Sequence, residues 1–174
     1  MFRRRVDPRK LAGRAARLEG DLLPESLPRV SALLAGEVHA STVKARLSFE
    51  TAMRGLVLVS GEVDASLMLQ CQRCLDPVCV PVTTAFRLAL RDDTGEGDLP
   101  PGFESLEAAG EFIVPADLVE EELLLALPFA AAHETVAECG ELARQYVSSG
   151  APQPAEQTRQ DKHPFAVLKG LKLD

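Results

Sequence analysis

Three of the four cysteines of this chain lie within nine residues, in the stretch LMLQCQRCLDPVCV (67–80). Two thiolates that are two residues apart in a tight turn, as Cys71 and Cys74 are, can share one tetrahedral zinc ion. A complete site needs two further ligands, and the later stretch HETVAECG contains a histidine and a cysteine. The candidate zinc ligands are therefore Cys71, Cys74, His133 and Cys139.

Two other interpretations of the C-x-x-C motif remain open. In a dithiol oxidoreductase the motif lies at the N-terminus of a helix after a parallel strand, where the helix dipole lowers the thiol pKa. Antiparallel strands are expected on both sides of this motif. A purely structural turn would pack its cysteines and leave Arg73 exposed or in contact with a partner. Cys79 is a poorer ligand, because its strand position directs it toward one face of a sheet.

Familiar catalytic motifs do not accompany the cysteines. The sequence contains no G-x-S-x-G, H-E-x-x-H, Walker or G-x-G-x-x-G pattern. The three glutamates at 120–122 suit a solvated helix face better than an acid–base pair. One tyrosine and no tryptophan argue against a stacking platform for single-stranded nucleic acid. We therefore expect a protein that is not an enzyme and has no small-molecule substrate.

Alternation with a period of two predicts the strands that would position the cysteines. Apolar and polar residues alternate in VKARLSFE (43–50). A longer alternating run begins at Val57 and ends at Cys71, and another follows the cysteine turn from Val78 to Arg91. Three consecutive strands of this kind predict an antiparallel meander with one buried face. FESLEAAGEFIV (103–114) predicts a further strand pair.

Helical spacing predicts the other elements. Asp7-Pro8 reads as an N-cap and a first helical residue, so we expect a helix over 8–18. A second short helix is expected over 26–34. PADLVEEELLLALP (115–128) predicts the longest helix, with a capping box between Asp117 and Glu120. Its glutamates are expected to be exposed, and its inward-facing residues are expected to be Leu118, Val119, Leu123 and Leu125.

The elements together predict an α+β fold: an antiparallel β-meander sheet with short N-terminal helices, one longer helix after the sheet and a mobile C-terminal tail. A single domain is expected over 1–140. Residues 141–174 read as a flexible linker and a short amphipathic anchor, HPFAVLKGLK, in which Phe165 is a candidate contact residue. No apolar run is long enough to cross a bilayer, and the N-terminus lacks the apolar core of a secretory signal. We therefore expect a cytoplasmic protein without a membrane partner.

Charge is strongly segregated along the chain, whose net charge is −7. Residues 1–20 carry seven basic and two acidic side chains, whereas residues 92–145 carry one basic and fourteen acidic ones. Binding of RNA usually rests on a basic face, which the N-terminal segment alone could supply, through Arg3, Arg4 and Arg5. The acidic segment could attract a basic ribosomal protein or assembly factor through Glu120, Glu121 and Glu122, or form a solvated face.

Several segments, taken together, resemble the YceD family, the bacterial large ribosomal RNA subunit accumulation proteins. They are CQRCLDPV at the end of a long strand, the acidic loop, DLVEEELLLALPF, HETVAECG, the C-terminal HPFAVLKGLK and the N-terminal DPRKLAGRAARLEG. The resemblance covers nearly the whole chain in the same order. It implies a cytoplasmic, non-enzymatic factor in synthesis, processing or stability of the large-subunit (23S) ribosomal RNA. The alternative is a small zinc-binding interaction module built on the C-x-x-C turn.

The resemblance also carries individual residues over to this chain. His163 stands where the family usually has asparagine. Some members have more cysteines in the C-terminal third, which would complete a metal site, whereas Cys139 is the one cysteine there in this chain. Cys79 matches no family position. The residues that match the family are Cys71, Arg73, Cys74, Glu121, Leu124, Pro128, Cys139, Pro164, Phe165, Ala166 and Leu168.

Overall fold

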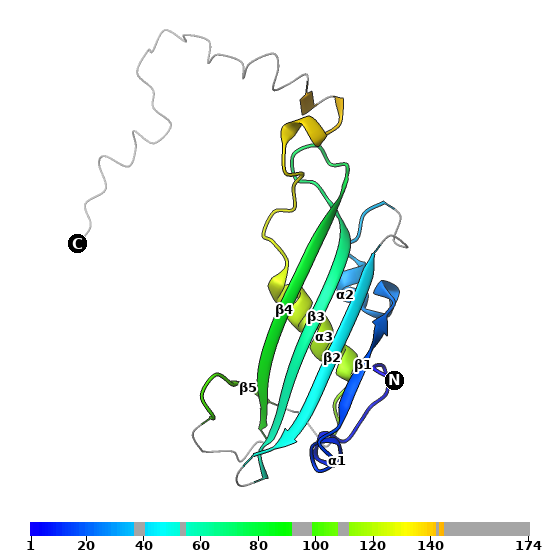
Figure 1. Ribbon diagram of the computed structural model, residues 1–174. Helices are drawn as coiled ribbons and strands as arrows, with labels where there is room; N and C mark the ends of the chain where they lie inside the picture. The colour runs from blue at the N-terminus through cyan, green and yellow to red at the C-terminus, as the bar shows by residue number, and fades with distance from the viewer. Residues whose placement is uncertain (37–40, 53–54, 92–98, 108–111, 142, 145–174) are drawn as a thin grey trace, which may run out of the picture.

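A five-stranded sheet is the main element of the computed structural model, which describes residues 1–36, 41–52, 55–91, 99–107, 112–141 and 143–144 (Figure 1). The sheet has the order β1-β2-β3-β4-β5. Strands β1 to β4 pair antiparallel with their neighbours, and β5 pairs parallel with β4. The α+β fold and the meander are thus confirmed. The strands are β1 (Arg17–Leu22), β2 (Thr42–Thr51), β3 (Val57–Gln70), β4 (Pro77–Arg91) and β5 (Glu104–Glu107).

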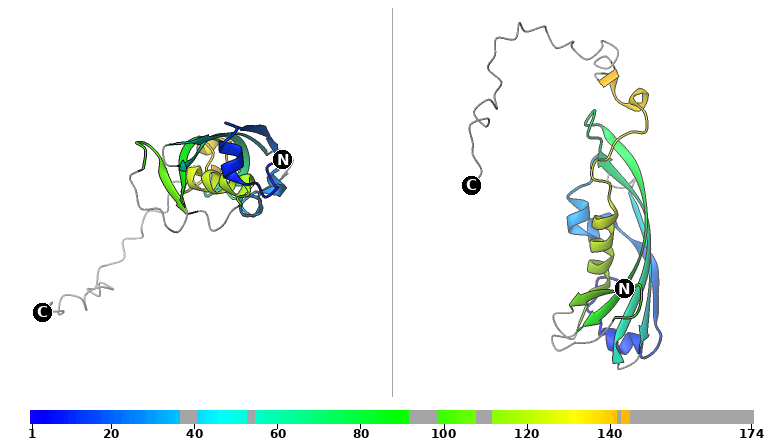
Figure 2. Two further views of the ribbon diagram at one scale, coloured as in Figure 1. Left: turned by 90° about the horizontal axis from the view of Figure 1, so that it is seen from below. Right: turned by 90° about the vertical axis from the view of Figure 1, so that its left-hand side faces the viewer.

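One face of the sheet is buried under helices, as the alternation predicts. Buried and more exposed residues alternate along the whole of β3. The longest helix, α3 (Pro115–Ala126), lies across the buried face, and α2 (Pro28–Ser31) lies beside it (Figure 2). The other short helix, α1 (Pro8–Ala12), lies at one end of the sheet. The predicted single long helix after the sheet is therefore confirmed.

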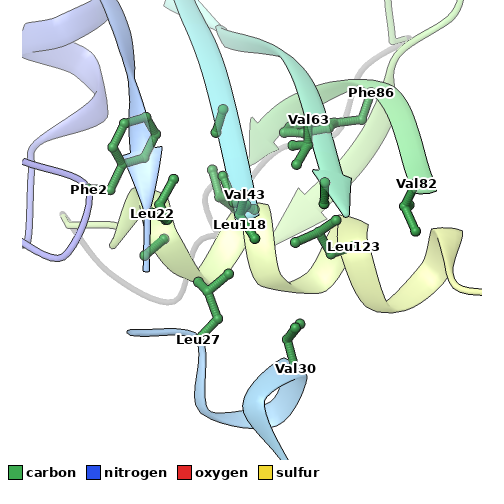
Figure 3. Close-up of a cluster of buried hydrophobic side chains, with 14 of the residues drawn as sticks. Phe2, Leu22, Leu27, Val30, Val43, Val63, Val82, Phe86, Leu118 and Leu123 are labelled. Carbon is green, nitrogen blue, oxygen red and sulfur yellow. The ribbon is translucent and has the colours of Figure 1, made fainter. Parts of the chain in front are cut away.

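The hydrophobic core fills the space between α3 and the sheet (Figure 3). Leu123 of α3 and Val63 of β3 are both fully buried. Burial of such side chains stabilises the fold by roughly 1.5–3 kcal/mol each. Gly61 has a specific role in this packing, because a Cβ atom there would lie 2.1 Å from the ring of Phe86. The glycine therefore leaves space for an aromatic ring from the neighbouring strand.

The N-terminal helix is correctly capped but shorter than predicted. Asp7 accepts hydrogen bonds from the backbone N–H groups of Arg9 (3.0 Å) and Lys10 (3.2 Å), which confirms the N-cap. The helix ends at Ala12 rather than residue 18, and residues 17–22 form β1 instead. The prediction was wrong because Leu18 and Leu22 also fit a period of two, and pairing with β2 satisfies their backbone.

Two further elements differ from the predictions. The second helix is only the single turn α2, preceded by the 3₁₀ turn Pro24–Ser26. The described residues of the segment 103–114, which are 103–107 and 112–114, do not form a strand pair with each other. Instead β5 pairs with β4, and Ile113 forms an isolated bridge with Val6 near the N-terminus. Among the described residues, no helix has the length and apolar character that a membrane span requires.

Glu120 occupies a different position from the one predicted. Helix α3 has Val114 at its N-cap and no side-chain cap, so the capping box between Asp117 and Glu120 is wrong. Glu120 is 4% exposed, and its carboxylate accepts the backbone N–H groups of Arg29 (2.7 Å) and Val30 (3.2 Å). It therefore caps the N-terminus of α2. At the other end of α3, Leu125 is 72% exposed, although its spacing predicts an inward position.

Replacing Glu120 by alanine is expected to lower the free energy of unfolding by about 1–3 kcal/mol, because two N–H groups of α2 lose their acceptor. Glu120→Gln keeps one acceptor oxygen and should cost less. Glu121→Ala is the matched control, since Glu121 is exposed and contacts only the Arg29 guanidinium in the described structure (2.5 Å). Urea unfolding of the three variants measures the difference. Equal losses for the variants at 120 and 121 would contradict the assigned capping role.

Candidate metal centre

The tip of the β3–β4 hairpin holds the first two candidate ligands. Cys71 follows β3 directly, and its backbone N–H donates to the carbonyl of Asp76 (2.9 Å). The amide of Leu75 donates back to the carbonyl of Cys71 (2.9 Å), which closes a tight turn. Leu75 has a φ of 65°, a left-handed conformation that a leucine rarely adopts. The turn therefore holds Cys71 and Cys74 on one side of the hairpin tip.

The segment that follows α3 supplies the other two ligands. It returns to the hairpin tip, where the carbonyl of Ala131 accepts the amide of Gln72 (2.8 Å). Beyond it, the 3₁₀ turn η4 (Val136–Glu138) directs Cys139 back toward the tip. Gly140 allows this close approach, because a Cβ atom there would lie 2.4 Å from Oδ2 of Asp76. The two segments are thus in direct contact.

The four predicted ligands form one cluster. The ligand atoms of Cys71, Cys74, His133 and Cys139 all lie within 4.8 Å of one another. Nδ1 of His133 lies 3.6 Å from Sγ of Cys74 and 3.7 Å from Sγ of Cys139. In a tetrahedral zinc site, bond lengths of about 2.3 Å to sulfur and about 2.0–2.1 Å to nitrogen separate these atoms by about 3.6 Å. The two nitrogen–sulfur distances therefore fit a tetrahedral ion that three thiolates and one imidazole would hold.

The surroundings of Cys71 also favour its thiolate form. Burial would raise the pKa of Cys71, but hydrogen bonds from the backbone of Cys74, Arg73 and His133, and from the His133 side chain, lower it to about 5. Burial raises the pKa of Cys139 to about 11, and the neighbouring Cys74 adds to this effect. Thiols this close together do not all ionise, because neighbouring thiolates repel one another. A divalent cation would offset this repulsion, because cysteine ligands bind a metal as thiolates.

Groups around the cluster hold the ligands in place. The guanidinium of Arg73 donates to the carbonyl of His133, and Nε of Arg144 donates to the carbonyl of Cys139 (2.7 Å). The hydroxyl of Thr135 donates to Glu138 (3.0 Å) inside the connecting turn. Such outer contacts fix the orientation of metal ligands. Arg73, which was predicted to contact a partner, is exposed, and its guanidinium donates a hydrogen bond to the segment that contains His133.

The lowered pKa of Cys71 agrees with the redox interpretation of the C-x-x-C motif, but the position of the motif does not. The motif lies in the turn between two antiparallel strands and does not begin a helix. All four cysteines are free thiols. Cys79 is exposed on β4, on the strand face opposite the buried Val78, as its strand position predicts. Cys71 and Cys74, in the turn, belong to the cluster, whereas Cys79, on the strand, does not.

Sequence reasoning missed the residues that support the site. Asp76 and Gly140 pack against each other where the two segments meet. Arg144 follows Cys139 in the chain and donates a hydrogen bond to its carbonyl. The glycine directly after Cys139 is a signal that could have been used, because glycine allows close backbone approach. The left-handed Leu75 gives no such signal, since leucine there contradicts the usual preference for glycine.

The candidate partner residues lie apart from this cluster. Arg3, Arg4 and Arg5 are exposed, and the Arg5 guanidinium lies over the ring of Phe112 (5.5 Å to its centroid). Of the three glutamates of α3, Glu120 is buried, Glu121 is exposed and paired with Arg29, and Glu122 is partly buried. The expectation that all three are exposed is therefore wrong. Phe165 lies outside the described residues.

Comparisons with known proteins agree with the order of these motifs. Residues 59–172 match the family model described as large ribosomal RNA subunit accumulation protein YceD. A curated relative from Haemophilus influenzae, the large ribosomal RNA subunit accumulation protein YceD, is 31% identical over 170 residues, which cover 96% of this chain and 94% of the relative. No solved structure matches. The chain therefore belongs to the YceD family of large ribosomal RNA subunit accumulation proteins.

Proposed function

We propose that this protein is a non-enzymatic, cytoplasmic factor in the synthesis, processing or stability of the large-subunit ribosomal RNA. The observation that carries the proposal is its membership in the YceD family over nearly its full length. The proposed partner is ribosomal RNA itself or a basic ribosomal protein or assembly factor. The segregated charge of the chain supports both, since one segment is basic and another is acidic.

Cells depleted of the protein are expected to contain a lower ratio of large- to small-subunit ribosomal RNA than wild-type cells. Rescue by the wild-type chain should restore the ratio, because the factor acts on the large-subunit RNA alone. Total RNA profiles before and after depletion measure this effect. An unchanged ratio, or an equal fall in both ribosomal RNAs, would reject the proposal.

The three N-terminal arginines are the proposed contact with RNA. They do not lie on a loose end, because Phe2 is buried in the core and its carbonyl accepts the amide of Ala116 (3.0 Å). On the other side, Val6 and Ile113 exchange two backbone hydrogen bonds (2.8 and 2.9 Å). The intervening arginines are thus held at a fixed place on the surface. Such a cluster suits phosphate groups, whose binding releases counterions.

Reversal of the charges, with Arg3, Arg4 and Arg5 replaced by glutamate, is expected to reduce co-sedimentation with precursors of the large subunit at least tenfold at low salt. Reversal of Glu121 and Glu122 to lysine should leave it unchanged if the arginines contact RNA. Glu120 is excluded from the comparison because it is buried. If binding is lost only when Glu121 and Glu122 are replaced by lysine, the protein docks a basic protein instead of RNA.

A second proposed property is a structural zinc ion held by Cys71, Cys74, His133 and Cys139. The observation that favours it is the tetrahedral spacing of these ligands. A bound zinc ion would tie the segment after α3 to the hairpin tip. Four protein ligands leave no open position, which is typical of structural rather than catalytic zinc. The centre would then make this protein a zinc-containing member of its family, with an interaction surface near the tip.

Purified protein is expected to contain about one zinc ion per chain. Cys71→Ser should lose the metal, and Cys79→Ser is the matched control, because Cys79 is exposed on a strand and outside the cluster. Zinc at 100 times its Kd should raise the free energy of unfolding by about 2.7 kcal/mol. Metal analysis and chemical unfolding with and without a chelator measure both effects. Equal zinc content in the two variants would argue against this centre.

A further inference from the structure

Strand β4 is longer than β5, the strand that pairs with its outer edge. On one side β3 pairs with it from Pro77 to Leu90. On the other side β5 pairs only with Leu88–Arg91 (Figure 1). Within the described part of the chain, the edge of β4 from Pro77 to Arg87 therefore has no strand partner. An uncovered strand edge is a template for pairing with another chain.

Contacts of β3 identify which backbone groups of β4 point to this free edge. The amide of Met68 donates to Oγ of Ser41 (3.0 Å), and its carbonyl accepts the amide of Ala35 (2.8 Å). Both groups of Met68 thus point away from β4. In an antiparallel pair, opposite residues either bond to each other or both turn away. Cys79, the residue opposite Met68, therefore directs its N–H and C=O groups to the free edge.

The same parity continues along β4. Pro81, Thr83 and Ala85 direct their backbone to the free edge, as does the amide of Arg87. Proline has no N–H group, so Pro77 and Pro81 block the part near the hairpin tip, as edge prolines commonly do. The remaining residues, 82–87, span about 20 Å at about 3.3 Å per residue. No backbone group of the described residues bonds the edge-facing groups of Thr83 and Ala85.

The surroundings of this segment are acidic. An open groove of about 920 Å³ passes Ala85 and Arg87, includes Glu104 and Glu122, and continues over the outer face of the sheet. Its lining contains five carboxylates and three guanidinium groups. Partial burial and the nearby charges of Glu104 and Glu121 raise the pKa of Glu122. Glu19 and Glu62 pair with Arg46. The other lining carboxylates, Glu50, Glu104 and Glu122, outnumber Arg17 and Arg87, and this excess favours a cationic ligand.

We propose that residues 82–87 of β4 bind an extended, basic segment of a partner protein, which adds to the sheet as a strand beside β4. The backbone of Thr83 and Ala85 would supply the hydrogen bonds, and the acidic groove would accept the basic side chains. A second copy of this chain is disfavoured, because it would bring another acidic segment to the same place. The basic character of the partner rests on the proposed function, in which a basic ribosomal protein or assembly factor is one candidate partner. The observation that this edge of β4 has no described strand partner does not rest on it.

A synthetic decapeptide of alternating lysine and threonine serves as the probe. We expect it to bind the full-length protein and to slow hydrogen exchange of the amides of Thr83 and Ala85 at least tenfold. The matched control peptide has the same sequence with N-methyl groups on alternate residues, which removes the backbone donors of one edge. It should bind at least tenfold more weakly. Binding without protection of these amides, or equal binding of the two peptides, would overturn the proposal.

Two protein variants test the same edge. Ala85→Pro removes one edge-facing amide and should weaken peptide binding at least tenfold, while Ala85→Ser keeps the amide and should not. Protection of the β3 amides from hydrogen exchange shows whether the Ala85→Pro variant is folded. If that variant does not fold, the peptide experiment on the unmodified protein still tests the proposal. A peptide of residues 160–174 tests the chain's own tail. Tighter binding of that peptide than of the probe would reject a separate partner. None of these results depends on the ribosomal RNA ratio.

Discussion

The pairing of β3 with β4 is the interaction on which the rest of the structure depends. β3 has 14 residues and so extends about 48 Å, whereas the 12 residues of α3 extend about 18 Å. The helix can therefore cover only part of the hairpin, and the segment that follows α3 covers the tip, where Cys71 and Cys139 are fully buried. Figure 1 shows the tip projecting beyond α2 and α3. Packing against α3 stabilises the part that the helix covers, and the cluster of cysteines and histidine joins the core beyond the end of the helix.

This arrangement explains which features were predictable from the sequence. Strands with one wet and one buried face have a strict period, so β2, β3 and β4 were predicted closely. The Asp7 cap was predicted because it depends on local spacing, and the four clustered residues were predicted because cysteine and histidine are the residue types that bind zinc. β1 was missed because its few apolar residues fit two periods. The pairing of Glu120 with α2 joins residues 91 positions apart, and no local pattern indicates such a contact.

The acidic segment illustrates the limit of counting charges. Its glutamates have different environments: Glu120 is buried at the end of α2, and Glu121 is paired with Arg29. Glu122 and Glu104 instead lie close enough for their charges to interact, and Arg87 lines the same groove. A uniform acidic surface is therefore the wrong description. Among the described residues, Glu104 and Glu122 line the groove beside Arg87, near the end of β4 where β5 pairs with it.

The bridge between Val6 and Ile113 has a consequence for the order of folding. These residues are separated by 107 positions (113 minus 6), and the contact between Phe2 and Ala116 spans 114 positions (116 minus 2). Contacts this distant in sequence form slowly, and during synthesis the first partner must wait until the second has left the ribosome. A nascent chain therefore lacks the fixed arginine surface, which is completed only when α3 has been made.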